Sequence, residues 1–168
     1  MRIIGIDPGI AIVGFGIIDK QGNRLIPKQY GCIRTEAHTP DPLRLKQVYD
    51  ATTSLIKKYQ PNEMGIEKLF FNRNVTTAFS VGQARGVIML AAEEAGIPVY
   101  EYTPLQVKQA VVGYGQAEKK QIQEMVRLLL SLPEVPKPDD VADALGVAIT
   151  HANSSHIHNI INGGKKGL

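Results

Sequence analysis

The stretch "RIIGIDPGIAIVGFGIID", residues 2–19, contains two aliphatic runs that are interrupted by Asp7, Pro8 and Gly9. Runs this rich in Ile and Val are typical of buried β-strands. Asp-Pro-Gly is typical of a turn, with Pro8 at its second position and Gly9 at a backbone angle that other residues rarely adopt. A buried strand rarely ends on a carboxylate without a partner, because such a charge is costly. Either Asp7 opens a hairpin, or the strand end holds it for a cation or for phosphate chemistry.

The composition limits the classes of protein to consider. The chain has 168 residues, of which 43% are apolar and 21% charged, as in one globular domain with a sizeable core. No apolar run reaches the roughly 18 residues of a membrane span, and no signal-peptide pattern opens the chain, so we expect a cytoplasmic protein without a membrane partner. Cys32 is the single cysteine, which excludes an internal disulfide. The net charge of +3 favours polyanionic partners weakly.

The periodicity of apolar residues predicts five strands and five helices. The predicted strands are residues 2–7, 11–19, 25–34, 63–70 and 97–104, and the predicted helices are 41–60, 74–96, 104–112, 117–130 and 139–153. Three strands joined by tight turns form an antiparallel meander, and helical crossovers add two more strands. We therefore predict an α/β fold with a five-stranded mixed sheet flanked by helices. Residues 1–153 form a single domain, and residues 154–168 form a polar, basic and flexible tail.

The candidate chemistry lies in acidic residues. Asp7 ends the first predicted strand, Glu67 lies within the fourth, and Asp140 and Asp143 begin the last helix. Taken singly, each has a simple explanation, since acids suit the first turn of a helix and Glu67 could face solvent. If the first and fourth strands pair, however, the acids can converge. Converging carboxylates repel one another unless cations separate them, and oxygen ligands select Mg²⁺ or Mn²⁺.

Several motifs resemble the RuvC family of bacterial Holliday-junction resolvases, within the RNase H-like nuclease superfamily. These motifs are "GIDPG" (5–9) with "GFGII" (14–18), "IEKLFF" (66–71), "VGQARG" (81–86), "VKQAVVGYGQAEKKQIQEMV" (107–126) and "DDVADALGVAITH" (139–151). They occur in the family's order and cover nearly the whole chain. The resemblance implies an RNase H-like fold and a crossover junction endodeoxyribonuclease that resolves four-way DNA junctions by symmetric paired nicks, in recombination and repair.

The resemblance also implies the site residues and the partners. Asp7, Glu67, Asp140 and Asp143 form the catalytic, metal-binding set, which would hold two Mg²⁺ ions, with Mn²⁺ as a possible substitute. Asp139 precedes the motif and is interpreted as a helix cap. The residues that would contact DNA are Phe70, as a base-stacking aromatic, and Lys108, Lys119, Arg73 and Arg85. The implied partners are junction DNA, a second copy of the chain, with residues 75–96 as the candidate interface, and the branch-migration proteins RuvA and RuvB.

Some assignments stay open from the sequence alone. Phe71 could replace Phe70 as the stacking aromatic, and Lys108 and Lys119 could simply be solvated. His151 could support the acids or simply lie near the end of the last helix. An actin-like or sugar-kinase-type ATPase also opens with an Asp-x-Gly turn, but it would need a second such hairpin, and the sequence contains none. A non-catalytic junction-binding module would lack one of the acids, and all of the positions are filled.

Overall fold

The computed structural model describes residues 1–68 and 75–163. Its sheet contains the five predicted strands. The strands are β1 (Arg2–Asp7), β2 (Ile12–Gln21), β3 (Arg24–Arg34), β4 (Glu63–Glu67) and β5 (Val99–Tyr102). Their order across the sheet is β3-β2-β1-β4-β5. The pairs β1–β2 and β2–β3 are antiparallel, whereas β1–β4 and β4–β5 are parallel. The prediction of a mixed sheet built from a meander and two crossovers is confirmed.

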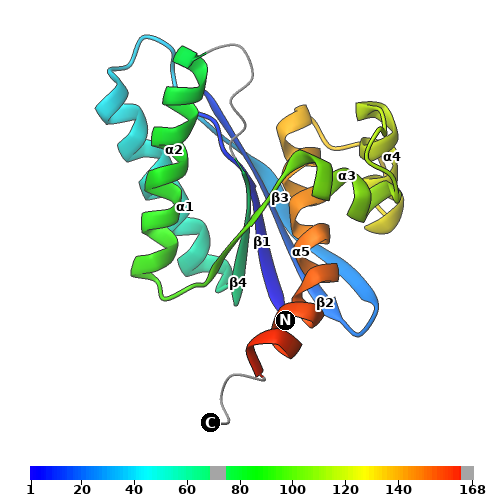
Figure 1. The fold of residues 1–168 in the computed structure, drawn as a ribbon. Coiled ribbons are helices and arrows are strands. Elements are labelled where there is room, and N and C mark those ends of the chain that lie inside the picture. The colour runs from blue at the N-terminus through cyan, green and yellow to red at the C-terminus, as the bar shows by residue number, and fades with distance from the viewer. Residues whose placement is uncertain (69–74, 164–168) are drawn as a thin grey trace.

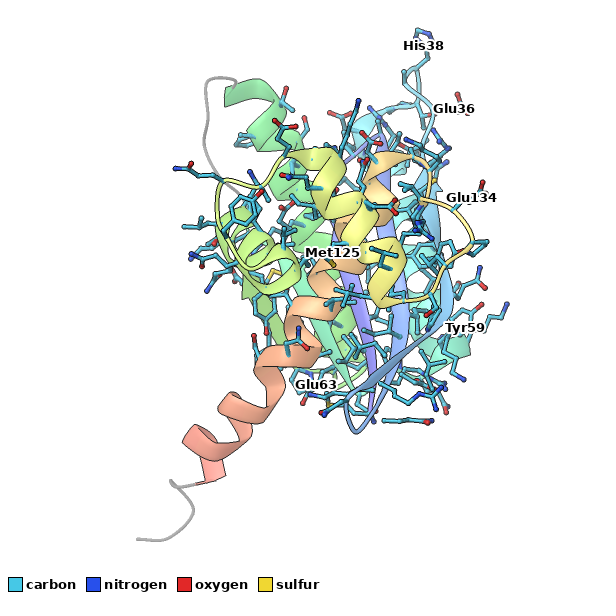
Figure 2. The ribbon with its side chains drawn as sticks, turned by 90° about the vertical axis from the view of Figure 1, so that its right-hand side faces the viewer. Glu36, His38, Tyr59, Glu63, Met125 and Glu134 are labelled. Atoms are coloured by element: carbon cyan, nitrogen blue, oxygen red, sulfur yellow. The ribbon has the colours of Figure 1, made fainter. Side chains whose placement is uncertain are left out.

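Helices cover both faces of this sheet (Figure 1). They are α1 (Asp41–Tyr59), α2 (Val75–Glu94), α3 (Pro104–Val112), α4 (Lys119–Leu129) and α5 (Asp139–Gly163). The pair α1 and α2 covers one face, and α5 lies on the other with α3 and α4 outside it. Figure 2 shows α4, which carries Met125, in front of α5. Within the described residues, no helix is both long and apolar enough to cross a membrane.

Side chains of β1 alternate between two hydrophobic cores. Ile4 and Ile6 belong to the core under α1 and α2, whereas Ile3 belongs to the core under α5. This alternation follows from the two-residue period of a strand. It also places Gly5 and Asp7 on the α5 face of the sheet.

Helix α5 lies unusually close to the sheet because glycines line the strands beneath it. A β-carbon at Gly5 would lie 2.7 Å from the β-carbon of Ala148, and one at Gly16 would lie 2.8 Å from Cγ of Leu145. A β-carbon at Gly14 would collide with the backbone oxygen of Asp140. These positions exclude a side chain, and this close approach fixes where the acids of α5 meet the sheet.

Element boundaries differ from the prediction mainly at two places. Strand β4 ends at Glu67, whereas the prediction continued it to Phe70, which lies outside the described residues. Helix α5 continues to Gly163, well past its predicted end at Asn153. Residues 154–162 mix polar side chains with Ile157, Ile160 and Ile161, none of them is Gly or Pro, and polar residues alone do not end a helix. The predicted domain boundary at residue 153 stays a prediction.

Replacing Gly5 by alanine should destabilise the protein, because the added methyl group has no space beneath α5. Overpacking of this kind costs about 1–3 kcal/mol of unfolding free energy. Gly31→Ala is the matched control, because a β-carbon there meets only the ring edge of Phe15, at 3.3 Å. Urea unfolding curves would measure both variants. Equal stability of Gly5→Ala and Gly31→Ala would contradict the close packing of α5.

Candidate acidic active site

Asp7 and Glu67 come together because β1 and β4 are parallel neighbours. The register pairs Gly5 with Gly65. Two residues further along, Asp7 and Glu67 end these adjacent strands on the face that α5 covers. Both side chains are half-buried. The pairing of the first and fourth strands, which was the condition for the acids to converge, is present in the sheet.

The N-terminal turns of α5 bring the other two acids to the same end of the sheet. Asp7 pairs with Gly14 across the β1–β2 ladder, and Gly14 lies directly under the backbone of Asp140. Asp143 follows one turn later and is half-buried. The absence of a side chain at Gly14 therefore lets the start of α5 approach the end of β1.

The carboxyl groups lie close enough to shift one another's pKa values in several cases. Burial and then the charge of Glu67 raise the pKa of Asp7 to about 9, helped by a hydrogen bond to Glu67 and by the charges of Asp143 and Asp140. Burial also raises the pKa of Glu67, and so does the charge of Asp143. The pKa of Asp143 is likewise raised, chiefly by burial. Such mutual repulsion is what a cation between the groups would relieve.

A lysine borders this acidic cluster. Lys119 Nζ lies 3.3 Å from Oδ2 of Asp143 and 3.3 Å from Oδ2 of Asp139. Its positive charge lowers the pKa of Glu67 and opposes the rise in the pKa of Asp143. Lys108 and Lys119, the two lysines predicted to contact DNA, line the same pocket of about 230 Å³. The full lining is Glu67, Pro104, Val107, Lys108, Lys119, Ile122 and Asp143.

The donor set fits a hard divalent cation. All four acids supply carboxylate oxygens, which are the ligands that Mg²⁺ and Mn²⁺ prefer. In the part of the chain that the structure describes, no three His, Cys, Asp or Glu side chains are already gathered as ligands of one ion. Asp143 is instead paired with Lys119. The acids share one end of the sheet, neighbouring carboxylates help raise the pKa of Asp7, Glu67 and Asp143, and a cation would draw the oxygens together.

A buried arginine supports the loop that follows Asp7. Thr35 Oγ1 donates a hydrogen bond to the backbone oxygen of Ile10 at 2.6 Å, and Arg44 Nε donates to Thr35 Oγ1 at 2.9 Å. Arg44 is only 9% exposed. Helix α1 therefore braces the β1–β2 connection, so the Asp-Pro-Gly segment both turns the chain and presents a half-buried carboxylate.

His151 lies away from the acids and joins α5 to two strands. Its Nε2 lies 2.6 Å from Glu63 Oε2 in β4, and its Nδ1 lies 2.6 Å from the hydroxyl of Tyr102 in β5. The ring of His151 is fully buried. Glu63 starts β4, at the opposite end of that strand from Glu67, and Figure 2 shows it beside α5. The interpretation of His151 as a residue near the end of its helix is wrong, because α5 continues to Gly163.

Of the remaining residues predicted to contact DNA, some lie within the described residues and others lie outside them. Arg85 is only 19% exposed at its side chain and forms an ion pair of 2.8 Å with Glu101 of β5. Lys108 is half-buried and faces the pocket. Phe70, Phe71 and Arg73 lie outside the described residues, so their roles stay predictions.

The fold and the acidic cluster define an RNase H-like protein with a candidate nuclease site. The family model described as crossover junction endodeoxyribonuclease RuvC matches residues 3–151. The crossover junction endodeoxyribonuclease RuvC of Brevibacillus brevis is 71% identical over 166 residues, which cover 99% of this chain and 100% of that protein. That of Desulfitobacterium hafniense is 62% identical over 163 residues, covering 97% and 99%. The chain belongs to the RuvC family, as its motifs predicted.

Solved structures agree with this assignment. Thermus thermophilus RuvC in complex with a Holliday junction substrate is 36% identical, with a TM-score of 0.89, and the match covers 94% of this chain and 96% of that one. The yeast mitochondrial Holliday junction resolvase Ydc2 is 14% identical with a TM-score of 0.66, covering 99% and 84%, and shares the fold. The prediction of an RNase H-like fold is confirmed.

Asp7→Asn should raise the thermal stability of the metal-free protein. Asp7 binds its proton more tightly in the folded chain, where its pKa is about 9, than at its ordinary value of 3.8. Its contribution to stability is therefore complete below pH 3.8 and is lost as the pH rises through about 9. In EDTA at pH 8, the folded chain must bind a proton at Asp7 that the unfolded chain does not hold, and Asn avoids this cost.

We expect the variant's Tm to rise by at least about 2–4 °C, the shift that 1 kcal/mol produces in a chain of this size. Calorimetry would measure it, with Glu36→Gln as the control, since Glu36 is an exposed acid away from the sheet (Figure 2). A Tm at or below that of the unmodified protein would show that Asp7 is not electrostatically strained.

Proposed function

We propose that this chain resolves four-way DNA junctions by metal-dependent hydrolysis of two phosphodiester bonds, in recombination and repair. The observation that carries the proposal is the meeting of Asp7, Glu67 and the start of α5 at one end of the sheet. Membership of the RuvC family supports it, and so does the junction bound to the Thermus thermophilus relative. An actin-like ATPase and a non-catalytic module are not favoured by these matches.

The acids would act through divalent cations. Asp7, Glu67, Asp140 and Asp143 would hold two Mg²⁺ ions, or Mn²⁺ in their place, and the ions would stabilise the charge that develops on the phosphate oxygens. The pairing of β1 with its neighbours would hold the backbone of Asp7 in place as the reaction proceeds. A carboxylate on a fixed backbone lowers the reorganisation that the transition state requires.

The lysines of the pocket would hold the DNA backbone. Lys108 and Lys119 share the pocket with Glu67 and Asp143, so a phosphate that reaches the acids also meets two ammonium groups. Phosphate contacts of this type orient a nucleic acid without reading its sequence. Phe70 and Arg73, which lie outside the described residues, remain proposed DNA contacts. Arg85 is a weaker candidate, because Glu101 already neutralises it.

A homodimer would place two such sites on one junction, because paired symmetric nicks need sites related by a twofold axis. Helix α2 offers a surface for it. Its buried side holds Ala84 and Ile88, and its outer side exposes Phe79 by 70% and Leu90 by 51%. By family resemblance, we propose that the dimer acts in the cytoplasm with RuvA and RuvB.

Asp7→Asn should abolish junction cleavage while leaving junction binding largely intact, because Asn keeps the shape of Asp but not its anionic oxygen. The test uses a synthetic four-way junction with each strand labelled in turn, incubated with Mg²⁺ or with EDTA. The unmodified protein should cut two opposite strands at equivalent positions, and only with Mg²⁺. Linear duplex of the same sequence is the substrate control, and Glu36→Gln is the protein control. Full cleavage by Asp7→Asn would refute the acidic site.

Leu90→Glu should convert the proposed dimer into a monomer, since a charge would replace an exposed apolar side chain on the proposed interface helix. Leu128→Glu is the matched control, because Leu128 on α4 is exposed to nearly the same extent, 53% against 51%. Sedimentation equilibrium at micromolar concentration would compare the two. If both variants were monomeric, or if both remained dimeric, the interface would not lie on α2.

A further inference from the structure

Lys119 occupies a fixed place at the acidic site. It is the first residue of α4, and the start of this helix is held by a capping box between Glu118 and Gln121. The hydroxyl of Tyr114 donates a further hydrogen bond to Gln121 Oε1 at 2.9 Å. The start of α4 therefore holds the Lys119 ammonium within reach of α5.

The ion pairs of Lys119 differ from those of the other nearby lysines. Its Nζ is 3.3 Å from Asp143, a proposed cation ligand, and 3.3 Å from Asp139, which is not one. Lys137 pairs with Asp139 alone, at 3.5 Å. Lys108 lines the same pocket, and within the described residues it forms no ion pair. Among the described lysines near the site, Lys119 alone bridges a proposed ligand and a neighbouring acid.

This bridge has a direct consequence for cation binding. The Lys119 ammonium and a divalent cation would need the same carboxylate of Asp143, so they compete for it. Asp139 offers the ammonium a second acceptor at the same distance, and Lys119 can keep that partner when it loses Asp143. The ammonium would then stay at the rim of the pocket, next to Lys108, where a DNA phosphate would arrive.

We propose that Lys119 is a displaceable counter-charge for Asp143, and that Asp139 is the positioning residue that retains Lys119 at the pocket when a divalent cation takes its place. This inference rests on the proposed metal site. It gives Asp139 a role that a helix-capping residue would not have, because its effect on cation binding must pass through Lys119.

The test is calorimetric titration of the full chain with Mn²⁺ in the absence of DNA. Lys119→Gln should tighten Mn²⁺ binding by about two- to fivefold, the factor expected when a competing, partly exposed ion pair is removed. Lys108→Gln and Lys137→Gln are matched controls, because each removes the same charge nearby without touching Asp143, and both should change the affinity less. If Lys119→Gln and Lys108→Gln changed the Mn²⁺ affinity equally, the effect would come only from the loss of a nearby positive charge. That outcome would overturn the proposal.

A double-mutant cycle tests Asp139. Asp139→Asn should weaken Mn²⁺ binding in the unmodified protein, because Lys119 then pairs with Asp143 alone, and it should have a clearly smaller effect in the Lys119→Gln background. The same loss in both backgrounds would show that Asp139 acts as an independent charge and would overturn its positioning role. Asp7→Asn separates the two proposals: if it binds Mn²⁺ as well as the unmodified protein does, the metal site fails and this inference fails with it.

Discussion

The close approach of α5 to the sheet is the constraint on which the site depends. Glycines at positions 5 and 14 leave no side chain between strand and helix, so the helix backbone rests almost directly on β1 and β2. A larger residue would move the start of α5 outward and take Asp140 and Asp143 away from Asp7. The glycines of the motifs "GIDPG" and "GFGII" therefore act by letting α5 pack close to the sheet. The position of the acids follows from this packing.

The acids that this packing gathers oppose the stability of the metal-free fold. Burial and mutual repulsion raise the pKa of Asp7, Glu67 and Asp143, which means that each ionised carboxylate weakens the folded state. The remainder of the molecule offsets this cost through two apolar cores and through polar ties such as the contacts of His151 with Glu63 and Tyr102. Lys119 supplies part of the counter-charge. The site is strained by its own charges, as expected where a cation belongs.

Sequence reasoning found the sheet and the acids because both depend on local patterns. The Ile-rich runs predicted the strands, and the position of Asp7 at a strand end was visible in the sequence. Sequence reasoning did not find contacts between distant segments. The bridge from Lys119 to Asp139 depends on how α4 packs on α5, and the burial of His151 depends on how α5 packs on β4 and β5. No local spacing encodes either contact. Asp139 was interpreted as a cap, although Lys137, two residues before it, was a weak signal of an ion pair. The length of α5 was missed because polar composition was taken as the end of the helix.

We propose that the packing of α5 gathers carboxylates from three elements around a divalent cation. Crystals of the protein grown with Mn²⁺ and measured at the manganese absorption edge would test this. We expect an anomalous peak among the carboxylates of Asp7, Glu67 and Asp143, with the Lys119 ammonium displaced from Asp143 and still beside Asp139. Anomalous density only elsewhere on the surface, with Lys119 still paired to Asp143, would contradict it.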